Sequence, residues 1–245
     1  MHRYLLNLSY LGTPFRGVQK QASAKGGRID DLLTVQGQVE MGLKMLEPLN
    51  EAAVVISSRT DAGVHAIQTT MHTDLQGKKD KPYKPSSITE CLNNFFFKNQ
   101  VPIRILKTYL VPSDFHCRHR AISRTYLYRI IVIKNCKDLR LQHLPIEEYS
   151  RCLFLNGDEF NVNKAHEAAK LFVGYHDFRT FMHKSSFAPI HKITRKVIER
   201  CEIYESTSRW SNTYAWPFCV SYDEANYKAY DVVIKGKGFL YKQVR

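Results

Sequence analysis

One carboxylate in this chain has the neighbours that nucleophilic or acid–base chemistry requires. Asp61 stands in Arg59-Thr60-Asp61-Ala62-Gly63, directly after the apolar run 52–58. A carboxylate at a strand end can face a substrate, and the nearby Arg59 favours its charged form. Gly63 allows the backbone to bend closely beneath a bound molecule. Asp61 is therefore a candidate nucleophile, and an aspartate that caps a turn is the alternative interpretation of the same residues.

Histidines suggest two further kinds of chemistry, and the sequence favours neither. His65 follows Asp61 closely. An acid–base pair is one interpretation, but a histidine at a strand start is more typical of a structural hydrogen bond. The pattern His116-Cys117-x-His119 resembles a metal-binding pair, yet Arg118 and Arg120 oppose a cation there and no second ligand pair has suitable spacing. The sequence therefore predicts no metal site.

Charge indicates the class of partner. The 245 residues include 36 Lys and Arg against 23 Asp and Glu, a formal net charge of +13. So basic a protein attracts polyanions, and nucleic acid is the commonest of them.

The apolar fraction of 44% is that of a globular protein, and no apolar run approaches the roughly 20 residues that cross a bilayer. None of the six cysteines forms a C-x-x-C pair, which argues against a zinc ribbon and favours a reducing compartment.

Hydrophobic periodicity in the first half predicts alternating strands and helices. Thr34 precedes apolar residues at spacings of three and four, so it is expected to cap a helix. The expected strands are 4–10, 52–58, 64–73 and 103–111, and the expected helices are 34–46 and 86–97. The order β-α-β-β-α-β is that of a ferredoxin-like fold.

The second half gives weaker signals. Its strongest strand pattern is 124–133, followed by a helix at 163–173 and strands at 195–204 and 227–234. Residues 239–245 have the pattern of the first turn of a helix, so we expect the second half to be a C-terminally incomplete version of its fold. The expected boundary between the halves lies after residue 112.

Five segments, in order, resemble the motifs of TruA-type tRNA pseudouridine synthases, and the resemblance is closest to the eukaryotic, mitochondrial-type branch. The most specific of them contains Arg-Thr-Asp-Ala-Gly-Val-His-Ala. Val18 departs from the family pattern, which usually has Trp there. The segments are Gly12–Gln19, Ser57–Ala66, Phe115–Tyr128, Gly174–Phe181 and Gly238–Arg245.

This resemblance implies an α+β fold of two ferredoxin-like α/β halves whose sheets join into one central mixed sheet with a basic active-site cleft. Residues 1–112 would form the N-terminal half with the catalytic Asp. Residues 113–245 would form the incomplete C-terminal half with the Tyr and Arg of the cleft. The implied activity is an isomerase that converts uridine to pseudouridine in the anticodon stem-loop of tRNA, at nucleotides 38–40. The target base is flipped out of its stack, and no cofactor is needed.

The resemblance also assigns roles within the catalytic centre. Asp61 would be the nucleophile at the ribose of the target uridine. Tyr126 would stack on the target base, with Tyr128 as its rival because both lie on one face of a strand. Arg245 would pair with Asp61 through charge-assisted hydrogen bonds. Leu240 would form an apolar wall of the base pocket.

Basic residues would hold the RNA. Those that the resemblance assigns are Arg59, Arg118, His119, Arg120 and Arg124. Phosphate contacts of this kind offset the cost of unstacking the base. The second basic cluster, from Lys78 to Lys84, is more typical of a solvated charged loop.

Several features stay open at this stage. The expected partner is tRNA, with no membrane, and the bacterial members imply a homodimer. The resemblance implies a mitochondrial protein, although no presequence is visible and a nuclear or cytoplasmic location is also compatible. One alternative function is a catalytically weak RNA-binding or assembly protein of the same fold. A hydrolase that uses Asp61 and His65 is the other, and no nucleophile–base or metal constellation supports it.

Overall fold

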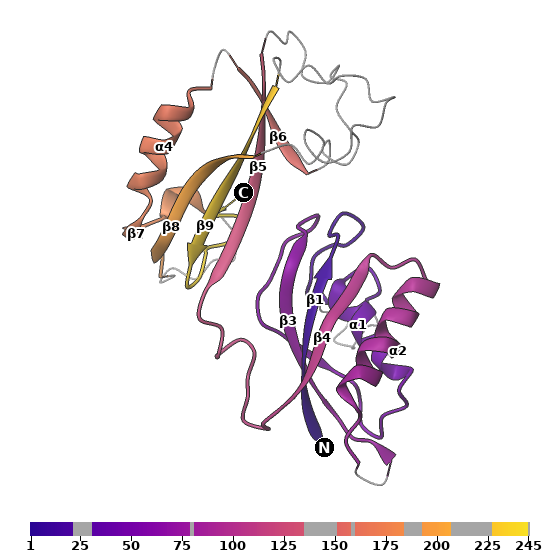
Figure 1. Ribbon diagram of the computed structural model, residues 1–245. Coiled ribbons are helices and arrows are strands. Elements are labelled where there is room, and N and C mark those ends of the chain that lie inside the picture. The colour runs from indigo at the N-terminus through magenta and orange to yellow at the C-terminus, as the bar shows by residue number, and fades with distance from the viewer. Residues whose placement is uncertain are drawn as a thin grey trace, which may run out of the picture. The chain divides into compact units, whose positions relative to one another are not determined.

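The structure is a computed structural model that describes residues 1–21, 31–78, 81–134, 151–157, 160–183, 193–206 and 227–244. The chain divides into two compact units, Met1–Ala121 and Ile122–Arg245, which we call the N-terminal and C-terminal units. Figure 1 colours the first from indigo to magenta and the second from pink to yellow. The α+β class expected from the sequence is confirmed, whereas the boundary expected after residue 112 stays a prediction.

The N-terminal unit has the β-α-β-β-α-β order that the sequence predicts. Its elements are β1 His2–Tyr10, α1 Val35–Lys44, β2 Val54–Ile56, β3 Ala66–Leu75, α2 Pro85–Lys98 and β4 Ile103–Val111. The strands form sheet 1 in the order β2-β3-β1-β4, and every neighbouring pair is antiparallel. This is the ferredoxin-like arrangement. The strand β1, first in the chain, therefore lies inside the sheet.

Sequence signals explain where α1 begins and which side it buries. The Oγ1 atom of Thr34 accepts a hydrogen bond from the backbone N–H of Gly37 at 3.2 Å, so the predicted cap is confirmed. Val35, Val39 and Leu43 are fully buried and follow one another at intervals of four residues. That spacing places them along one stripe of the helix, which packs on the sheet.

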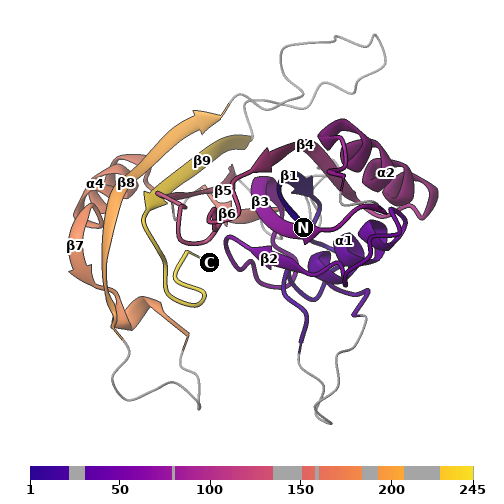
Figure 2. The ribbon, with the colours of Figure 1, turned by 90° about the horizontal axis from the view of Figure 1, so that it is seen from below.

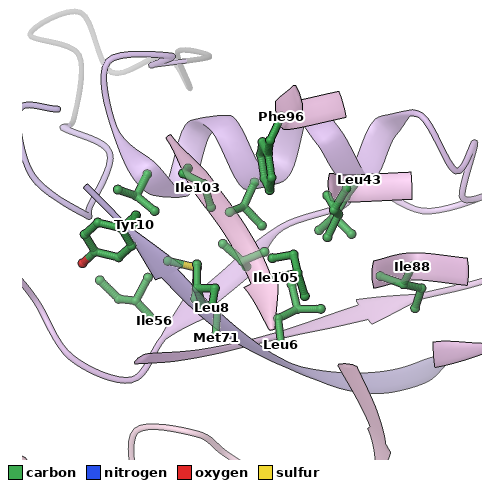
Figure 3. Close-up of a cluster of buried hydrophobic side chains, with 14 of the residues drawn as sticks. Leu6, Leu8, Tyr10, Leu43, Ile56, Met71, Ile88, Phe96, Ile103 and Ile105 are labelled. Carbon is green, nitrogen blue, oxygen red and sulfur yellow. The ribbon is translucent and has the colours of Figure 1, made fainter. Parts of the chain in front are cut away.

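The core of this unit lies between sheet 1 and its two helices. Alternate residues of β1, among them Leu6 and Leu8, point to this side and are completely buried. Figure 3 shows them packed beside Met71 of β3 and Ile105 of β4. Both helices cover the same face of the sheet (Figures 1 and 2). The opposite face of sheet 1 carries no helix among the described residues of this unit, and we call it the helix-free face.

The C-terminal unit contains a five-stranded sheet, sheet 2, in the order β6-β5-β9-β8-β7. Its elements are β5 Arg124–Ile133, β6 Cys152–Asn156, α4 Val162–Leu171, β7 Gly174–Asp177, the 3₁₀ helix η3 Arg179–Phe181, β8 Arg195–Ser206 and β9 Tyr227–Gly236. The pair β5–β6 is parallel and the other pairs are antiparallel. The neighbours β5, β9 and β8 repeat the order of β1, β3 and β2, with α4 in the place of α1. This repeat supports the expected relation between the two halves.

This unit differs from expectation in three places, and one of them is β7, a short strand that was not predicted. The strand β6 was not predicted; it lies beside β5, on the side where β4 lies beside β1 in the other unit. The first turn of a helix expected within 239–245 is wrong for the described residues. The backbone N–H of Gln243 donates to the carbonyl of Leu240 at 3.1 Å, and Lys242 has a φ of 58°, which a right-handed helix does not allow. The joining of the two sheets into one stays a prediction. None of the helices in the described part of the chain is long and apolar enough to cross a membrane.

Candidate active site

Asp61 lies in the loop between β2 and β3, as the sequence predicts. Its side chain is half-buried, and the neighbouring Arg59 is exposed. The carbonyl of Asp61 accepts a hydrogen bond from the N–H of Val64 at 3.2 Å, which closes a turn. Gly63 within this turn has a φ of +77°, a conformation that favours glycine. A tight turn therefore presents the carboxylate at the end of sheet 1.

A second motif, Gly12–Gln19, holds this turn in place. The N–H of Val18 donates to the carbonyl of Thr60 at 3.2 Å, and the N–H of Gly63 donates to the carbonyl of Phe15 at 3.4 Å. The N–H of Gly12 donates to Nδ1 of His65 at 3.2 Å. The expectation of a structural hydrogen bond at His65 is thereby confirmed. Two segments that stand far apart in the sequence thus form one backbone-to-backbone contact beneath Asp61.

This contact leaves little free space. A Cβ atom on Gly12 would lie 2.0 Å from the carbonyl oxygen of Val64, far inside the contact distance. The hydroxyl groups of Tyr10 and Thr60 are 2.7 Å apart and share a hydrogen bond. Since Thr60 directly precedes Asp61, the end of β1 fixes the residue next to the carboxylate.

A buried ion pair anchors Lys20, the residue directly after the Gly12–Gln19 motif, to the rest of the unit. Oε2 of Glu40, whose side chain is 7% exposed, lies 2.5 Å from Nζ of Lys20. Oε1 of Glu40 accepts from Nε2 of Gln36 at 3.0 Å and from the N–H of Val54 at 3.1 Å. Oε1 of Gln36 in turn accepts from the backbone N–H of Lys20 at 3.1 Å. One carboxylate therefore joins α1, the first residue of β2 and the residue directly after the motif.

A third motif begins at the same end of β2. The N–H of Cys117 donates to Nδ1 of His72 at 3.3 Å, and its thiol donates to the carbonyl of Val55 at 3.2 Å. Nε of Arg118 donates to the carbonyl of Ile56, the last residue of β2, at 3.3 Å. Arg118, with the exposed His119 and Arg120 after it, is thus placed next to the loop that carries Asp61.

The electrostatics of this segment fit a structural role for His72 and Cys117. Burial, with the nearby Arg3 and His116, lowers the pKa of His72 to about 4, so the ring is neutral and its Nδ1 can accept a hydrogen bond. Burial raises the pKa of the Cys117 thiol, which donates to the carbonyl of Val55 as a protonated thiol does. Within the described ranges, no group of three or more His, Cys, Asp or Glu side chains is arranged to hold a metal ion.

The remaining predicted site residues lie in the C-terminal unit. Tyr126 projects from β5, and its ring meets the ring of Phe239 edge to face, with centroids 5.0 Å apart. Leu240 is 6% exposed and packs in the core under α4, so the sequence did not reveal how deeply it is buried. Nη1 of Arg124 donates to the carbonyl of Lys237 at 2.6 Å. Arg245 lies outside the described residues.

Phe239 is a candidate that the sequence reasoning missed. It belongs to the same motif as Leu240, is more exposed than that residue, and touches Tyr126. Its aromatic type was the available signal, because aromatic rings stack on bases. The structure therefore brings the third and last motifs together at the start of β5. Asp61 and Tyr126 belong to different units, so their proximity in one active site stays a prediction.

The basic loop 78–84 contributes no comparable geometry. Nζ of Lys78 lies 3.0 Å from Oε2 of Glu47, and both side chains are about three-quarters exposed. Lys79 lies outside the described residues. A solvated ion pair of this kind agrees with the expected solvated loop.

Known proteins resemble the chain over nearly all of its length. A family model described as tRNA pseudouridine synthase matches residues 168–245. The human protein tRNA pseudouridine synthase-like 1 is 34% identical over 244 residues, which cover 99% of this chain and 74% of that protein. The Xenopus laevis protein of the same name is 32% identical over 244 residues, which again cover 99% of this chain and 74% of that protein. The tRNA pseudouridine synthase A of Dinoroseobacter shibae is 32% identical over 74% of this chain and 61% of that protein.

Proposed function

Because this chain belongs to the family of tRNA pseudouridine synthases, we propose that it isomerises a uridine of tRNA to pseudouridine, with Asp61 as the nucleophile. The enzyme class is that of an isomerase, and the reaction consumes no co-substrate. The bond between N1 of uracil and C1′ of ribose breaks, and a bond between C5 and C1′ forms. The proton on C5 is lost and N1 gains one, so atoms and electrons balance.

The observation that carries this proposal is the support beneath Asp61. The turn 60–64 exchanges hydrogen bonds with Gly12–Gln19, and Nε of Arg118 donates to the last carbonyl of β2. Two other motifs therefore contact the loop that presents this carboxylate or the end of the strand before it. A turn whose only role is to connect two strands does not need such support. Rigid placement of a nucleophile is what covalent catalysis requires.

The other residues have complementary roles in this proposal. The target uridine leaves the stack to reach Asp61, and Arg59 and Arg118 hold the flanking phosphates. Tyr126 stacks on the extruded base, beside Phe239. Arg245 pairs with Asp61 and orients it. Attack at C1′, elimination through a glycal and attack on the base are three routes compatible with these positions.

By resemblance, the proposed target is the anticodon stem-loop, the proposed location is mitochondrial, and the working form is a homodimer. The target is checked by chemical mapping of pseudouridine on tRNAs in which each uridine at 38–40 is replaced in turn. Loss of product from one replaced position identifies the site.

The catalytic assignment is tested with tRNA that carries tritium at C5 of uridine. Wild type is expected to release tritium, and Asp61→Asn is expected to release none above background while its affinity for tRNA stays within about twofold, since the change keeps the shape of the side chain. Asp114→Asn is a matched control, because Asp114 is an exposed loop carboxylate of the same unit, and its Oδ2 lies 3.7 Å from Nη2 of Arg120. This control should turn over like wild type.

The outcomes separate the competing interpretations. Equal tritium release from wild type and Asp61→Asn refutes the nucleophile. Binding without release in either protein favours the catalytically weak RNA-binding protein. Loss of both binding and release in wild type refutes the proposed function altogether.

A further inference from the structure

The helix-free face of sheet 1 has an unusual distribution of charge. On β4, Lys107 stands opposite Asn7 and Tyr109 stands opposite Leu5, both positions that point away from the helices. Arg104, opposite Ser9, lies on the same face. Arg104 and Lys107 are exposed. An edge of this face is therefore lined by cations.

Negative charge on the four strands is already neutralised. Their one acidic side chain is Asp74 of β3, and Nε and Nη2 of Arg3 bind its two oxygens at 2.8 and 2.7 Å. This bidentate pair holds the pKa of Asp74 below its usual range. No carboxylate on the strands of the helix-free face is thus left to compete with an incoming anion for Arg104 and Lys107.

An aromatic ring stands among these cations. Tyr109 is 41% exposed, and Nζ of Lys107 lies 5.1 Å from the centre of its ring. Exposed aromatic rings beside basic side chains are the usual platform on which proteins stack the bases of single-stranded nucleic acid. A four-stranded sheet with this combination is also how RNA-recognition modules bind unpaired bases.

The β2–β3 half of the same face is covered by the segment 115–118, through the contacts of Cys117 with Val55 and His72. That segment carries Arg118 and leads to Arg120, both exposed. The basic residues assigned by the sequence and those of β4 therefore flank one surface. At one end this surface adjoins the loop that carries Asp61, because Oγ of Ser9, on the helix-free face, donates to the carbonyl of Ala66, the first residue of β3, at 2.9 Å.

Asn7 gives an independent indication in the middle of this surface. Its Oδ1 atom is buried and has no hydrogen-bond partner among the described residues. In the sheet register, Asn7 stands between Lys107 of β4 and Thr70 of β3. An unpaired buried acceptor opposes folding, and such a group in a native protein calls for an explanation, such as a bound water or a ligand. A donor supplied by a ligand after a small side-chain adjustment would satisfy it.

We propose that the helix-free face of sheet 1 binds the RNA strand that leads to the target uridine, with phosphates on Arg104 and Lys107 and an unpaired base stacked on Tyr109. This inference rests on the proposed function and extends it to residues outside the family motifs. The stacking platform favours RNA over an acidic protein surface, because a polypeptide carboxylate needs cations but no aromatic face. The occupant is thus a single-stranded stretch of the tRNA substrate, next to the nucleotide that is modified.

The test compares two double variants of equal charge in tRNA binding across a range of salt concentrations. Arg104→Gln with Lys107→Gln removes the cations of the helix-free face. Lys44→Gln with Lys98→Gln removes two exposed cations at the ends of α1 and α2, on the other side of the sheet. Each lost phosphate contact lowers the slope of log affinity against log salt by about 0.7 to 0.9. We expect a decrease of about 1.5 for the first variant and little change for the second.

A third variant, Tyr109→Leu, separates stacking from charge. Affinity for tRNA should fall about tenfold with an unchanged salt slope, since a lost stacking contact involves no counterion. Thermal unfolding of each variant checks that the exposed substitutions leave the fold intact.

The possible results are distinct. Equal slopes for the two double variants, both folded, overturn the proposed surface and leave the function standing. Unchanged RNA binding by Tyr109→Leu, together with equal competition by polyglutamate and by single-stranded RNA, shows an acidic polypeptide as the occupant and also overturns it. A wild-type chain that fails to bind tRNA overturns both the surface and the proposed function.

Discussion

Neutralising Glu40 should loosen the N-terminal unit and, with it, the support of Asp61. In Glu40→Gln the amide oxygen can still accept from Gln36 and from the N–H of Val54. In the wild type, Oε2 of Glu40 lies 2.5 Å from Nζ of Lys20. In the variant the amide nitrogen takes the place of Oε2, so two hydrogen-bond donors face each other. The residue directly after the Gly12–Gln19 motif loses its anchor to α1.

The expected cost follows from burial. Removing one partner of a buried ion pair costs about 3 to 5 kcal/mol. The side chain of Glu40 is 7% exposed, but that of Lys20 is 20% exposed, so water recovers part of the loss. We therefore expect about 3 kcal/mol, near the lower end of the range. The matched control is Glu47→Gln, which breaks a pair with Lys78 whose side chains are 75% and 74% exposed. This change should cost no more than about 0.5 kcal/mol.

Hydrogen exchange followed by mass spectrometry is the suitable assay. This assay follows each unit through peptides of its own. Peptides from β1 should exchange about 100-fold faster in Glu40→Gln than in wild type, because 1.4 kcal/mol corresponds to a factor of ten. Peptides from β9 should be unchanged and serve as an internal control.

Two results would refute this reasoning. Exchange of β1 in Glu40→Gln that matches Glu47→Gln would show that the buried pair contributes no more than a surface pair. Faster exchange of β1 without any loss of turnover on tRNA would show that the pair stabilises the unit but does not position Asp61.

Three further predictions concern stability. Between pH 6.5 and about 4, His72 of the unfolded chain takes up a proton, whereas His72 of the native chain stays neutral. The free energy of unfolding therefore decreases as the pH falls through this range, by up to about 3 kcal/mol. His72→Gln should make this free energy less dependent on pH, as measured by urea titrations at pH 7 and 4.5. Gly12→Ala should destabilise by about 3 kcal/mol and lower turnover, because its Cβ meets the carbonyl of Val64, whereas Gly238→Ala enters open space and should shift the unfolding midpoint very little. Thr34→Ala should cost about 1 kcal/mol by loss of the helix cap, and an unchanged midpoint in urea would contradict the cap's contribution.

The elements that the sequence predicts well are those with strong local signals. The β-branched and aromatic run 124–133 has the same bounds as β5, and the apolar stripe after Thr34 gives α1 with its cap. The strand β6 has five residues and pairs in parallel with β5. So short a run has no decisive periodicity, and its parallel partner is not visible from its own residues.

The candidate site follows a similar division. Residue types and order were sufficient to nominate Asp61 and Tyr126. The contact of Cys117 with His72, the anchoring of Lys20 by Glu40 and the burial of Leu240 were not predicted, because each depends on side chains that meet across the fold. The residue type of an apolar position in a motif is the same whether its side chain lines a pocket or packs in a core.

The inner position of β1 has a consequence for synthesis on the ribosome. Arg3 pairs with Val111, so β1 cannot complete its pairing until β4 has been translated, about a hundred residues later. At rates of about 5 to 20 residues per second, the wait lasts on the order of 5 to 20 seconds. During that interval Leu6 and Leu8 have no complete sheet to pack in, and the nascent chain presents an apolar strand to chaperones and to neighbouring chains. The yield of this protein should therefore depend on translation speed before residue 111 more than on speed after it.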